Sequence, residues 1–229
     1  MSKKVMKEAF IASIPVMMGY IVLGIAFGML LESKGYHFIY AILMSGLIYA
    51  GSMQFVAINL LTSGASLISG AIMTLLINAR HLVYGLSMIK KFDNMGKLKP
   101  YMIFSLTDET YSLLVGSKTP EGCSEKYYLF FISLFDQCYW VIGSLMGSFI
   151  GSMLTINITG LDFAMTALFV VIVVEQFLTS EKHIYTYLGF GISLLCLLVF
   201  GSESFIIPSM IGILVSLVML YQKEGKQDA

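Results

Sequence analysis

The run from Phe38 to Ala79 contains no Asp, Glu, Lys or Arg. A helix rises about 1.5 Å per residue, so this run is long enough to cross a hydrocarbon core of about 30 Å roughly twice. The sequence therefore predicts two spans here, and Arg80 and His81 follow while the sequence is still apolar. A charge inside a membrane costs about 2.5 to 3.5 kcal/mol on insertion scales unless it is paired or hydrated. We expect this stretch to be the centre of function.

Composition predicts an all-helical, polytopic membrane protein. Hydrophobic residues make up 57% of the 229 residues, charged residues 12%, and the mean hydropathy is +0.83, whereas about a quarter of a soluble protein is charged. The long apolar runs argue against a transmembrane barrel, whose strands have about ten residues of alternating polarity. The formal net charge is zero and the basic residues lie in short loops, so nucleic-acid binding has no support.

The sequence indicates no enzyme, no cofactor and no metal site. Cys123, Cys138 and Cys196 are widely spaced and form no C-x-x-C pair, which is typical of small buried hydrophobic side chains. There is no H-E-x-x-H or G-x-S-x-G motif, and His81 alone is too little for a nucleophile and its base.

The apolar runs predict seven or eight spans in one permease domain, residues 1–229. With eight spans and both termini cytoplasmic, the basic loop 90–100 lies on the wrong side for the positive-inside rule. A re-entrant segment 101–116 gives seven spans and corrects this loop, but it moves the N-terminal lysines outside. Both counts stay open. The expected spans are about 10–31, 38–61, 67–88, 101–116, 127–153, 161–178, 184–200 and 204–221.

Span 38–61 contains Gly51 and Ser52 beside the amide of Gln54. A helix can open at such a place and expose backbone amides and carbonyls, as the broken helices of transporters do. The alternative for Gln54 is a hydrogen bond between two helices.

Polar residues of the next span fall on two neighbouring faces. Asn78, His81 and Gly85 share one face, and Arg80 and Tyr84 share the other. This pattern suits a lined cavity, and snorkelling of Arg80 to the headgroups is the alternative. The complete set of predicted substrate-binding residues is Gly51, Ser52, Gln54, Asn78, Arg80, Tyr84 and Gln176.

Three acids lie away from the ends of the expected spans: Asp108 and Glu109 in 101–116, and Asp136 in 127–153. An intramembrane carboxyl group can take up and release protons, as a proton-coupled carrier requires. Asp108 has a second interpretation as the fixed ion-pair partner of Arg80. The predicted proton-coupling residues are His81, Asp108, Glu109 and Asp136.

A weak internal repeat relates two parts of the chain. Tyr-x3-Gly-x3-Gly occurs at 20–28 and again at 139–147, and 53–55 matches 175–177. Chance similarity is the alternative, because the sequence is rich in Gly and Phe. A true repeat gives halves 1–116 and 127–221 that meet at a shared site, as in many secondary carriers.

Four motifs together resemble the AzlC family, the large subunits of bacterial branched-chain amino acid exporters. They lie at 50–55, 78–85, 107–109 and 161–169, and the match covers essentially the whole chain in order. The resemblance implies a multi-pass permease of the bacterial plasma membrane that exports leucine, isoleucine and valine, with methionine and azaleucine as further candidates. It also implies a proton-motive-force drive and a small membrane partner of the AzlD type.

The expected mechanism is alternating access around an apolar pocket that accepts a branched side chain. Backbone near Gly51 and Ser52, with Gln54, holds the ammonium and carboxylate groups, and Arg80 pairs with the carboxylate. The rivals are a passive channel, a carrier for another small zwitterionic solute, and a purely structural subunit. Embedded charges argue against the last, since a scaffold does not need them.

Overall fold

The computed structural model describes residues 3–153, 163, 166, 167, 170, 171, 173, 174, 177, 178 and 183–224. The described residues form helices and no strand, which confirms the all-helical membrane fold. Contacts divide the chain into two units, Met1–Leu168 and Phe169–Ala229. Most of the expected span 161–178, with Gln176, lies outside the described residues. Four described helices are long and apolar enough to cross a bilayer: Lys3–Ser33, Leu67–Met88, Glu125–Met153 and Ile184–Gly201.

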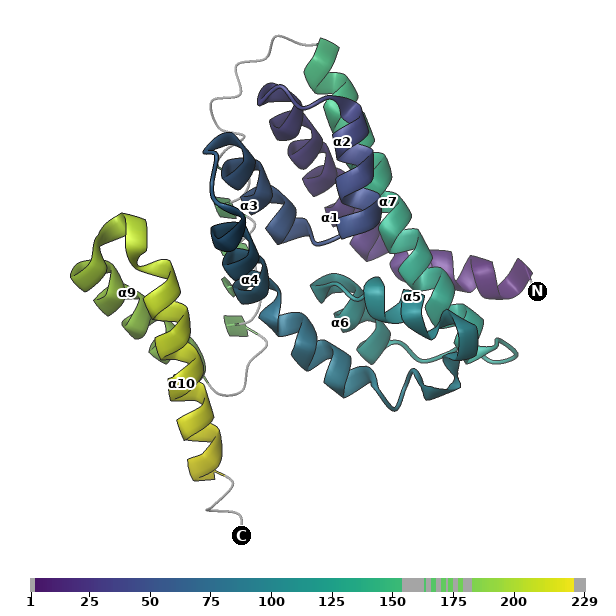
Figure 1. Ribbon diagram of the computed structural model, residues 1–229. Coiled ribbons are helices and arrows are strands. Elements are labelled where there is room, and N and C mark those ends of the chain that lie inside the picture. Colours follow the sequence, from purple (N-terminus) through teal and green to yellow (C-terminus); the bar gives the residue numbers. More distant parts are fainter. Residues whose placement is uncertain are drawn as a thin grey trace. The chain divides into compact units, whose positions relative to one another are not determined.

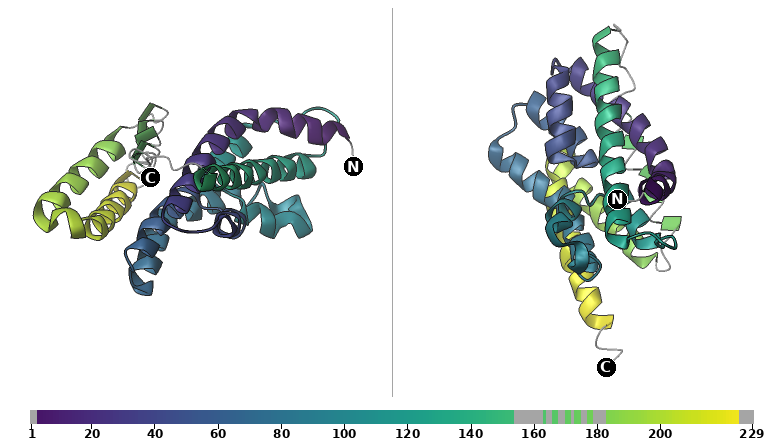
Figure 2. Two further views of the ribbon diagram at one scale, coloured as in Figure 1. Left: turned by 90° about the horizontal axis from the view of Figure 1, so that it is seen from above. Right: turned by 90° about the vertical axis from the view of Figure 1, so that its right-hand side faces the viewer.

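Two long helices, α1 (Lys3–Ser33) and α7 (Glu125–Met153), form the frame of the first unit. They lie side by side along most of their length (Figures 1 and 2). The hydroxyl groups of Ser13 and Tyr139 are 3.0 Å apart across the pair. Gly24 then lies against Gly143, and Gly28 against Gly147. Residue numbers in contact therefore increase in the same direction along both helices, so the two helices are parallel.

The glycine motifs of the predicted repeat pack directly on each other. Gly24 lies against Gly143, and Gly28 against Gly147. A Cβ atom on Gly28 would lie 2.0 Å from the carbonyl oxygen of Ser144, so no larger residue permits this approach of the two backbones. The motifs therefore serve close helix packing. Contact between equivalent positions suits a two-fold relation, and the repeat halves themselves stay a prediction.

The chain after α1 forms a broken helix. Tyr49 joins the two arms with a φ of 46°, a left-handed conformation that residues other than glycine rarely adopt. At about 1.5 Å per residue each arm is about 16–18 Å long, which is about half of a hydrocarbon core. The pieces are α2 (Phe38–Leu43), the π-helical turn η1 (Met44–Ile48) and α3 (Gly51–Thr62).

Ring contacts with α1 give the direction of α3. The rings of Tyr20 and Tyr49 lie 6.5 Å apart, and those of Phe27 and Phe55 lie 5.6 Å apart. As α3 proceeds it therefore moves along α1 toward the end at which α2 began (Figure 1). The expected opening of the helix beside Gly51 is thus observed, and the turn at Tyr49 sends the chain back, so that 38–61 is a re-entrant hairpin.

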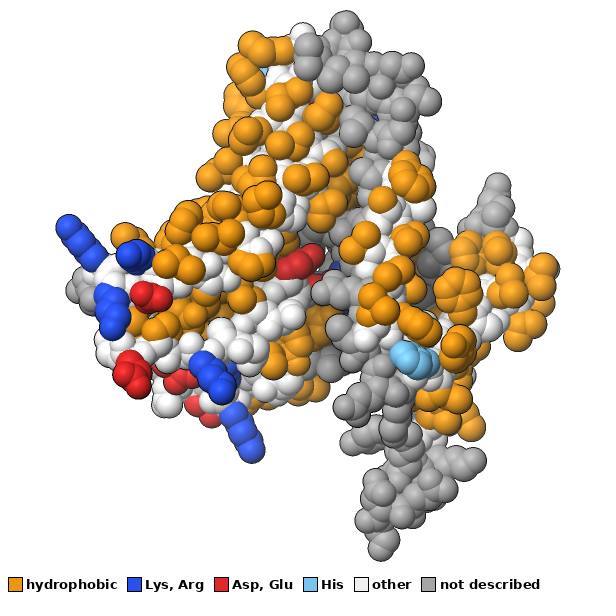
Figure 3. All heavy atoms as spheres, turned by 180° about the vertical axis from the view of Figure 1, so that it is seen from behind, with side chains coloured by type: hydrophobic (Ala, Val, Ile, Leu, Met, Phe, Trp, Pro, Cys, Tyr) orange, Lys and Arg blue, Asp and Glu red, His pale blue; other side chains and the backbone are white. Residues whose placement is uncertain are grey.

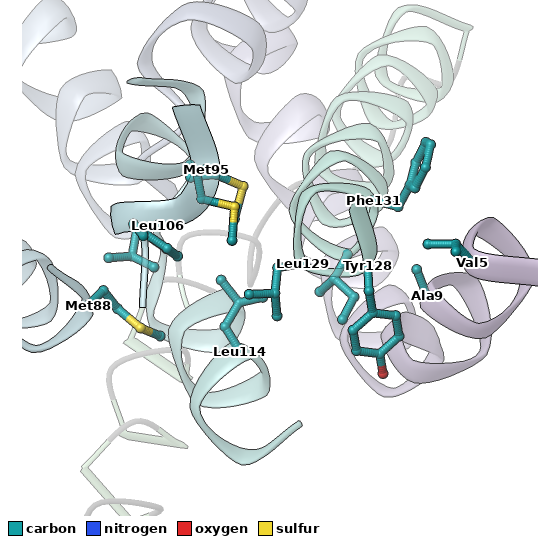
Figure 4. Packing of buried hydrophobic residues seen from close by; sticks show 12 residues of the cluster. Val5, Ala9, Met88, Met95, Leu106, Leu114, Tyr128, Leu129 and Phe131 are labelled. Atoms are coloured by element: carbon teal, nitrogen blue, oxygen red, sulfur yellow. The ribbon is translucent and has the colours of Figure 1, made fainter. Parts of the chain in front are cut away.

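Helix α4 (Leu67–Met88) runs the full depth of the unit, antiparallel to α1. Its N-terminus is capped by Ser66, whose hydroxyl accepts a hydrogen bond of 3.2 Å from the amide of Ser69, as N-cap serines usually do. Its last residue, Met88, belongs to the same buried cluster as Val5 of α1. The end of α4 therefore lies at the same end of the unit as the beginning of α1, with the cluster between them (Figure 4).

Residues 93–116 form a second hairpin, which enters from the end of the unit where α1 begins. Thr107 lies 2.5 Å from the hydroxyl of Tyr20 at mid-depth, and the carbonyl of Leu114 then accepts a hydrogen bond of 2.5 Å from Lys91 near the entry. This path agrees with the re-entrant alternative for 101–116, and the number of spans stays a prediction. The pieces of this hairpin are η2 (Asp93–Leu98), α5 (Lys99–Phe104) and α6 (Asp108–Gly116).

Buried apolar side chains hold this hairpin against the frame. Leu114 of α6 and Leu129 of α7 meet between the two helices, and the surrounding side chains come from α1, α4 and the second hairpin (Figure 4). The labelled members of the cluster are Val5, Ala9, Met88, Met95, Leu106, Leu114, Tyr128, Leu129 and Phe131.

With both hairpins re-entrant, α1, α4 and α7 are the traversing helices in the described part of this unit. The N-terminal lysines, the lysines of 90–99 and those of 118–126 then share one end. Figure 3 shows Lys and Arg side chains gathered at one end of a largely hydrophobic face. Lys34 lies at the opposite end. The conflict between the loop 90–100 and the N-terminal lysines therefore disappears.

The second unit contains α9 (Ile184–Ser204) and α10 (Ile206–Glu224). They pack as an antiparallel pair, with Gly212 of α10 against Ile192 of α9. Their positions match the two last expected spans.

Candidate functional site

The tips of the two hairpins meet at mid-depth in the first unit. One tip is Tyr49–Ala50 and the other is 105–107, and the rings of Tyr49 and Phe104 lie 6.3 Å apart. Helices α3 and α6 both begin at these tips. Unpaired amides and partial positive charge are found at helix N-termini, so two such ends are directed into one region.

The two N-termini differ in how they are capped. At α6 the hydroxyl of Thr107 accepts a hydrogen bond from the amide of Thr110, and Asp108 and Glu109 place negative charge in the first turn. At α3 the N-cap residue is Ala50, which offers no side-chain cap, and the first turn holds no acid. The positive end of α3 therefore has no anion of its own.

Arg80 connects the first turns of both half-helices. Its Nη1 lies 2.7 Å from Oδ2 of Asp108, and its Nη2 donates a hydrogen bond to the hydroxyl of Ser52. The side chains of the ion pair are 25% and 21% exposed. Arg80 reaches into the unit. The structure therefore shows an ion pair between Arg80 and Asp108, and the side chain of Arg80 does not extend to the headgroups.

A pocket of about 210 Å³ lies between the two tips and α4. Asn78, His81 and Gly85 all line it, which confirms that they share a face. Isoleucine, phenylalanine and leucine side chains form the opposite wall. The complete lining is Ile48, Tyr49, Ala50, Asn78, His81, Gly85, Ile103, Phe104 and Leu106.

Four buried polar atoms at or beside this pocket have no hydrogen-bond partner among the described residues: the hydroxyl oxygen of Tyr49, Oδ1 of Asn78, Nε of Arg80 and Oδ1 of Asp108. Buried polar atoms are nearly always paired, so an unpaired one asks for an explanation. The other polar lining side chain, His81, places Nδ1 3.2 Å from the carbonyl oxygen of Asn78. The amide oxygen of Asn78 is thus an acceptor available to a bound ligand.

Gln54 lies apart from the pocket lining. Its side chain is fully buried, its Oε1 accepts a hydrogen bond of 2.9 Å from Trp140 of α7, and its Nε2 lies 3.5 Å from the hydroxyl of Ser45. The structure therefore agrees with the second interpretation of Gln54, a hydrogen bond between two helices. Gly51 packs on the same indole, since a Cβ there would lie 3.3 Å from the Trp140 ring.

Tyr84 also lies outside the lining. Its ring stacks on that of Tyr111 with centroids 4.4 Å apart, which ties α4 to α6. Ser52 touches Arg80 and so contributes to the site indirectly. Gln176 is outside the described residues, and its role stays a prediction.

A chain of hydroxyl groups joins the other two predicted proton-coupling acids. The hydroxyl of Tyr20 lies 2.9 Å from Oε2 of Glu109 and 2.5 Å from Oγ1 of Thr107. Oγ1 of Thr107 lies 3.0 Å from that of Thr110, which lies 2.8 Å from Oδ2 of Asp136. Asp136 is fully buried on α7. The structure therefore brings Glu109 and Asp136 into one network.

Sequence reasoning missed Tyr20, Tyr49 and Thr110 as members of the site. The tyrosine of the motif at 20–28 is a signal for Tyr20, although from the sequence this motif is interpreted only as part of an internal repeat. Tyr49 carried no signal, because an apolar helix gives no warning of a left-handed residue. Thr110 stands beside the acidic pair and looks like an ordinary helix-start residue.

The chain thus has the fold of a helical membrane protein. The tips of two broken helices enclose a pocket at mid-depth that has a polar wall and an apolar wall. The sequence comparisons agree: the AzlC protein family matches residues 15–154. The chain belongs to the AzlC family.

Relatives from several bacteria cover most of the chain. It is 42% identical to the "Branched-chain amino acid transport protein AzlC" of Bacillus subtilis, over 97% of this chain and 87% of that protein. An "Uncharacterized membrane protein" of Helicobacter pylori is also 42% identical, over 96% of both chains. The "Inner membrane protein YgaZ" of Escherichia coli is 28% identical over 74% of this chain and 72% of that protein. No solved structure matches the chain.

Proposed function

We propose that this chain is the permease subunit of a secondary transporter that exports branched-chain amino acids across the bacterial plasma membrane. The pocket between the two hairpin tips carries the proposal, because it combines an apolar wall with polar groups at a helix N-terminus. The named Bacillus subtilis relative supports the substrate class.

The amino acid fits the pocket in one orientation. Its carboxylate lies at the uncapped N-terminus of α3, where backbone amides and Arg80 favour an anion. Its ammonium group donates to Oδ1 of Asn78, an unpaired acceptor in the pocket lining. Its branched side chain lies against Ile48, Ile103 and Phe104.

The size of the pocket suits this ligand. Its volume is about 210 Å³, and an apolar cavity of about 150 Å³ already holds a benzene molecule. A four-carbon side chain is smaller than benzene, which leaves room for the polar end. A basic or acidic side chain would leave a charge unpaired against the apolar wall, which is costly.

Alternating access follows from the position of the site. The first hairpin enters from one end of the unit and the second from the other, so movement of either one opens the pocket to one side. Lysine-rich loops are expected on the cytoplasmic side, and the second hairpin then faces the cytoplasm. His81, Asp108, Glu109 and Asp136 are the proposed proton-coupling residues, and a small AzlD-like subunit is the proposed partner.

A passive channel or a carrier for another small zwitterion is the second candidate. Export in cells loaded with dipeptides of valine, leucine, isoleucine or methionine separates the two. We expect faster loss of the amino acid when the chain is expressed with the small partner, and no acceleration when a protonophore is present. Acceleration that survives the protonophore would favour the channel, and no acceleration with any of the four would reject the substrate class.

Replacing Asn78 by alanine tests the pocket directly. The substrate ammonium loses its acceptor, so the apparent KM for valine efflux is expected to rise about tenfold, which corresponds to about 1.4 kcal/mol of binding. Asn59→Ala is the matched control, because Asn59 is an exposed asparagine on α3 outside the pocket lining. An equal effect of both substitutions on KM would contradict the assignment.

A further inference from the structure

We infer that Glu109 and Asp136 form a single proton-binding site, in which one proton is shared through the hydroxyl groups of Tyr20, Thr107 and Thr110. The role of this site in transport rests on the proposed function, but the site itself does not. The number of hydrogen atoms along the observed chain of oxygen atoms points to one shared proton.

The chain contains four oxygen-to-oxygen contacts, of 2.9, 2.5, 3.0 and 2.8 Å. Each contact needs one hydrogen atom to be a hydrogen bond. The hydroxyl groups of Tyr20, Thr107 and Thr110 supply one hydrogen each, which makes three. If Glu109 and Asp136 are both ionised, one of the four contacts has no hydrogen atom between its two oxygen atoms. One added proton completes all four bonds.

Two arrangements satisfy the chain equally. With the proton on Asp136, its Oδ2 donates to Thr110, Thr110 donates to Thr107, Thr107 donates to Tyr20, and Tyr20 donates to ionised Glu109. With the proton on Glu109, every bond reverses and Thr110 donates to ionised Asp136. The net result of the reversal is the transfer of one proton between the two carboxyl groups, with no charge left on a hydroxyl group.

The amide of Thr110 fits both arrangements. It donates to Oγ1 of Thr107 at 3.2 Å, and this oxygen has two lone pairs. In either arrangement one lone pair accepts from the amide and the other accepts from a hydroxyl group. The backbone of α6 therefore holds the middle of the chain in place while the direction of the bonds changes.

No cation is paired with either acid among the described residues. The charge of Arg80 reaches Glu109, but Arg80 forms its ion pair with Asp108, whose own charge also acts on Glu109. The other titratable groups that face the two acids are Tyr49 at the first tip, Tyr84 on α4, Tyr101 on α5 and Tyr139 on α7. Asp136 is fully buried, and its Oδ1 has no hydrogen-bond partner among the described residues. Two ionised carboxylates here would be costly, since buried charges need pairing.

The chain also links the site to the pocket. Thr107 is the N-cap of α6 at the second hairpin tip, next to the lining residue Leu106. A movement of this tip during alternating access would separate Thr107 from Tyr20. The proton would then stay on the carboxyl group that holds it, which is the requirement for coupling its release to one side.

Infrared spectroscopy of the purified protein in lipid tests the shared proton without transport. The readout is the carbonyl stretch of protonated carboxyl groups, compared among wild type, Glu109→Gln, Asp136→Asn and the double variant. Each amide mimics the protonated acid and completes the chain. We expect each single variant to lose the band of one protonated carboxyl group, and the double variant to lose no more. Loss in only one single variant, in neither, or additive loss would overturn the shared site.

Transport by Tyr20→Phe tests the relay. This variant keeps both acids but removes the linking hydroxyl group, so valine flux driven by a pH gradient in vesicles is expected to fall at least about tenfold. Exchange of labelled for unlabelled valine, which needs no net proton movement, is expected to persist. The matched control is Tyr139→Phe, whose hydroxyl contacts Ser13 outside the chain.

The outcomes separate the two proposals. If Tyr20→Phe keeps gradient-driven flux equal to that of Tyr139→Phe, the relay is wrong. If the wild type neither exchanges nor exports any branched-chain amino acid while the infrared result holds, the proposed function fails and the shared proton site stands.

Discussion

Arg80→Ala is expected to abolish amino acid export and to lower the free energy of unfolding by about 3 kcal/mol, the usual loss when one partner of a largely buried ion pair is removed. The guanidinium group binds Asp108 of one half-helix and Ser52 of the other. Without it the carboxylate of Asp108 is unpaired and the two hairpin tips lose the side chain that both contact.

The double variant Arg80→Ala, Asp108→Ala separates stability from function. It removes both charges, so the thermal stability in detergent is expected to recover toward that of the wild type. Export is expected to stay absent, because the positive charge near the substrate carboxylate is still missing. Export by the double variant at the wild-type rate would contradict the role of Arg80, and export by Arg80→Ala alone would do the same.

Gly28→Ala is expected to produce the largest loss of folded protein. The added Cβ would meet the carbonyl oxygen of Ser144 at 2.0 Å and the amide nitrogen of Ser148 at 2.5 Å. Both atoms belong to the backbone of α7, so the helices must separate. Overpacking of a well-packed core costs about 1–3 kcal/mol and occasionally more, and we expect a value at or above the top of this range. Size-exclusion chromatography and thermal unfolding in detergent measure the effect.

Gly19→Ala is the matched control on the same helix. A Cβ at Gly19 meets no atom within 4 Å, and alanine is favoured over glycine inside a helix by about 1 kcal/mol. This variant is therefore expected to be as stable as the wild type or slightly more stable. Equal destabilisation by Gly19→Ala and Gly28→Ala would show that helix contact is not the cause.

The packing glycines and the face of α4 can both be predicted from the sequence because both depend on local helical periodicity. Residues four apart lie on one side of any helix, so Gly24 and Gly28 had to form a strip of small residues, and Asn78, His81 and Gly85 had to face together. The pairing of Arg80 with Asp108 was one of two alternatives. An isolated basic and an isolated acidic residue in apolar sequence are expected to meet.

The opening of the first hairpin beside Gly51 was predicted, but the return of the chain was not predictable from the same rules. The segment 38–61 is long enough to cross a membrane, and hydropathy does not distinguish a crossing helix from two half-helices that enter and return. The turn depends on a left-handed Tyr49, a conformation set by tertiary contacts with Tyr20 and Phe104. The lysine distribution held the missing information, since a re-entrant segment 38–61 places the loop 90–100 with the N-terminal lysines, and a re-entrant segment 101–116 adds the lysines of 118–126.

The hydrogen-bond partner of Gln54 depends on tertiary structure. An amide in an apolar helix has to find a hydrogen-bond partner, but the sequence does not say whether this partner is a substrate or another helix. Here Trp140, distant in the sequence, occupies the amide oxygen at 2.9 Å. The pocket instead uses Asn78, whose oxygen is left unpaired.

The most direct test of the pocket is protection of a single cysteine at Ala50, which lines it at the first hairpin tip. Cys123, Cys138 and Cys196 are replaced by serine, and Ala50→Cys is labelled with a thiol reagent in membranes that contain the small partner. Leucine, isoleucine and valine are expected to slow this labelling, whereas lysine is not. A cysteine at Ala65, exposed in the loop before α4, should react at the same rate with and without them. Unchanged labelling at position 50 in a protein that still exports these amino acids would place the substrate elsewhere.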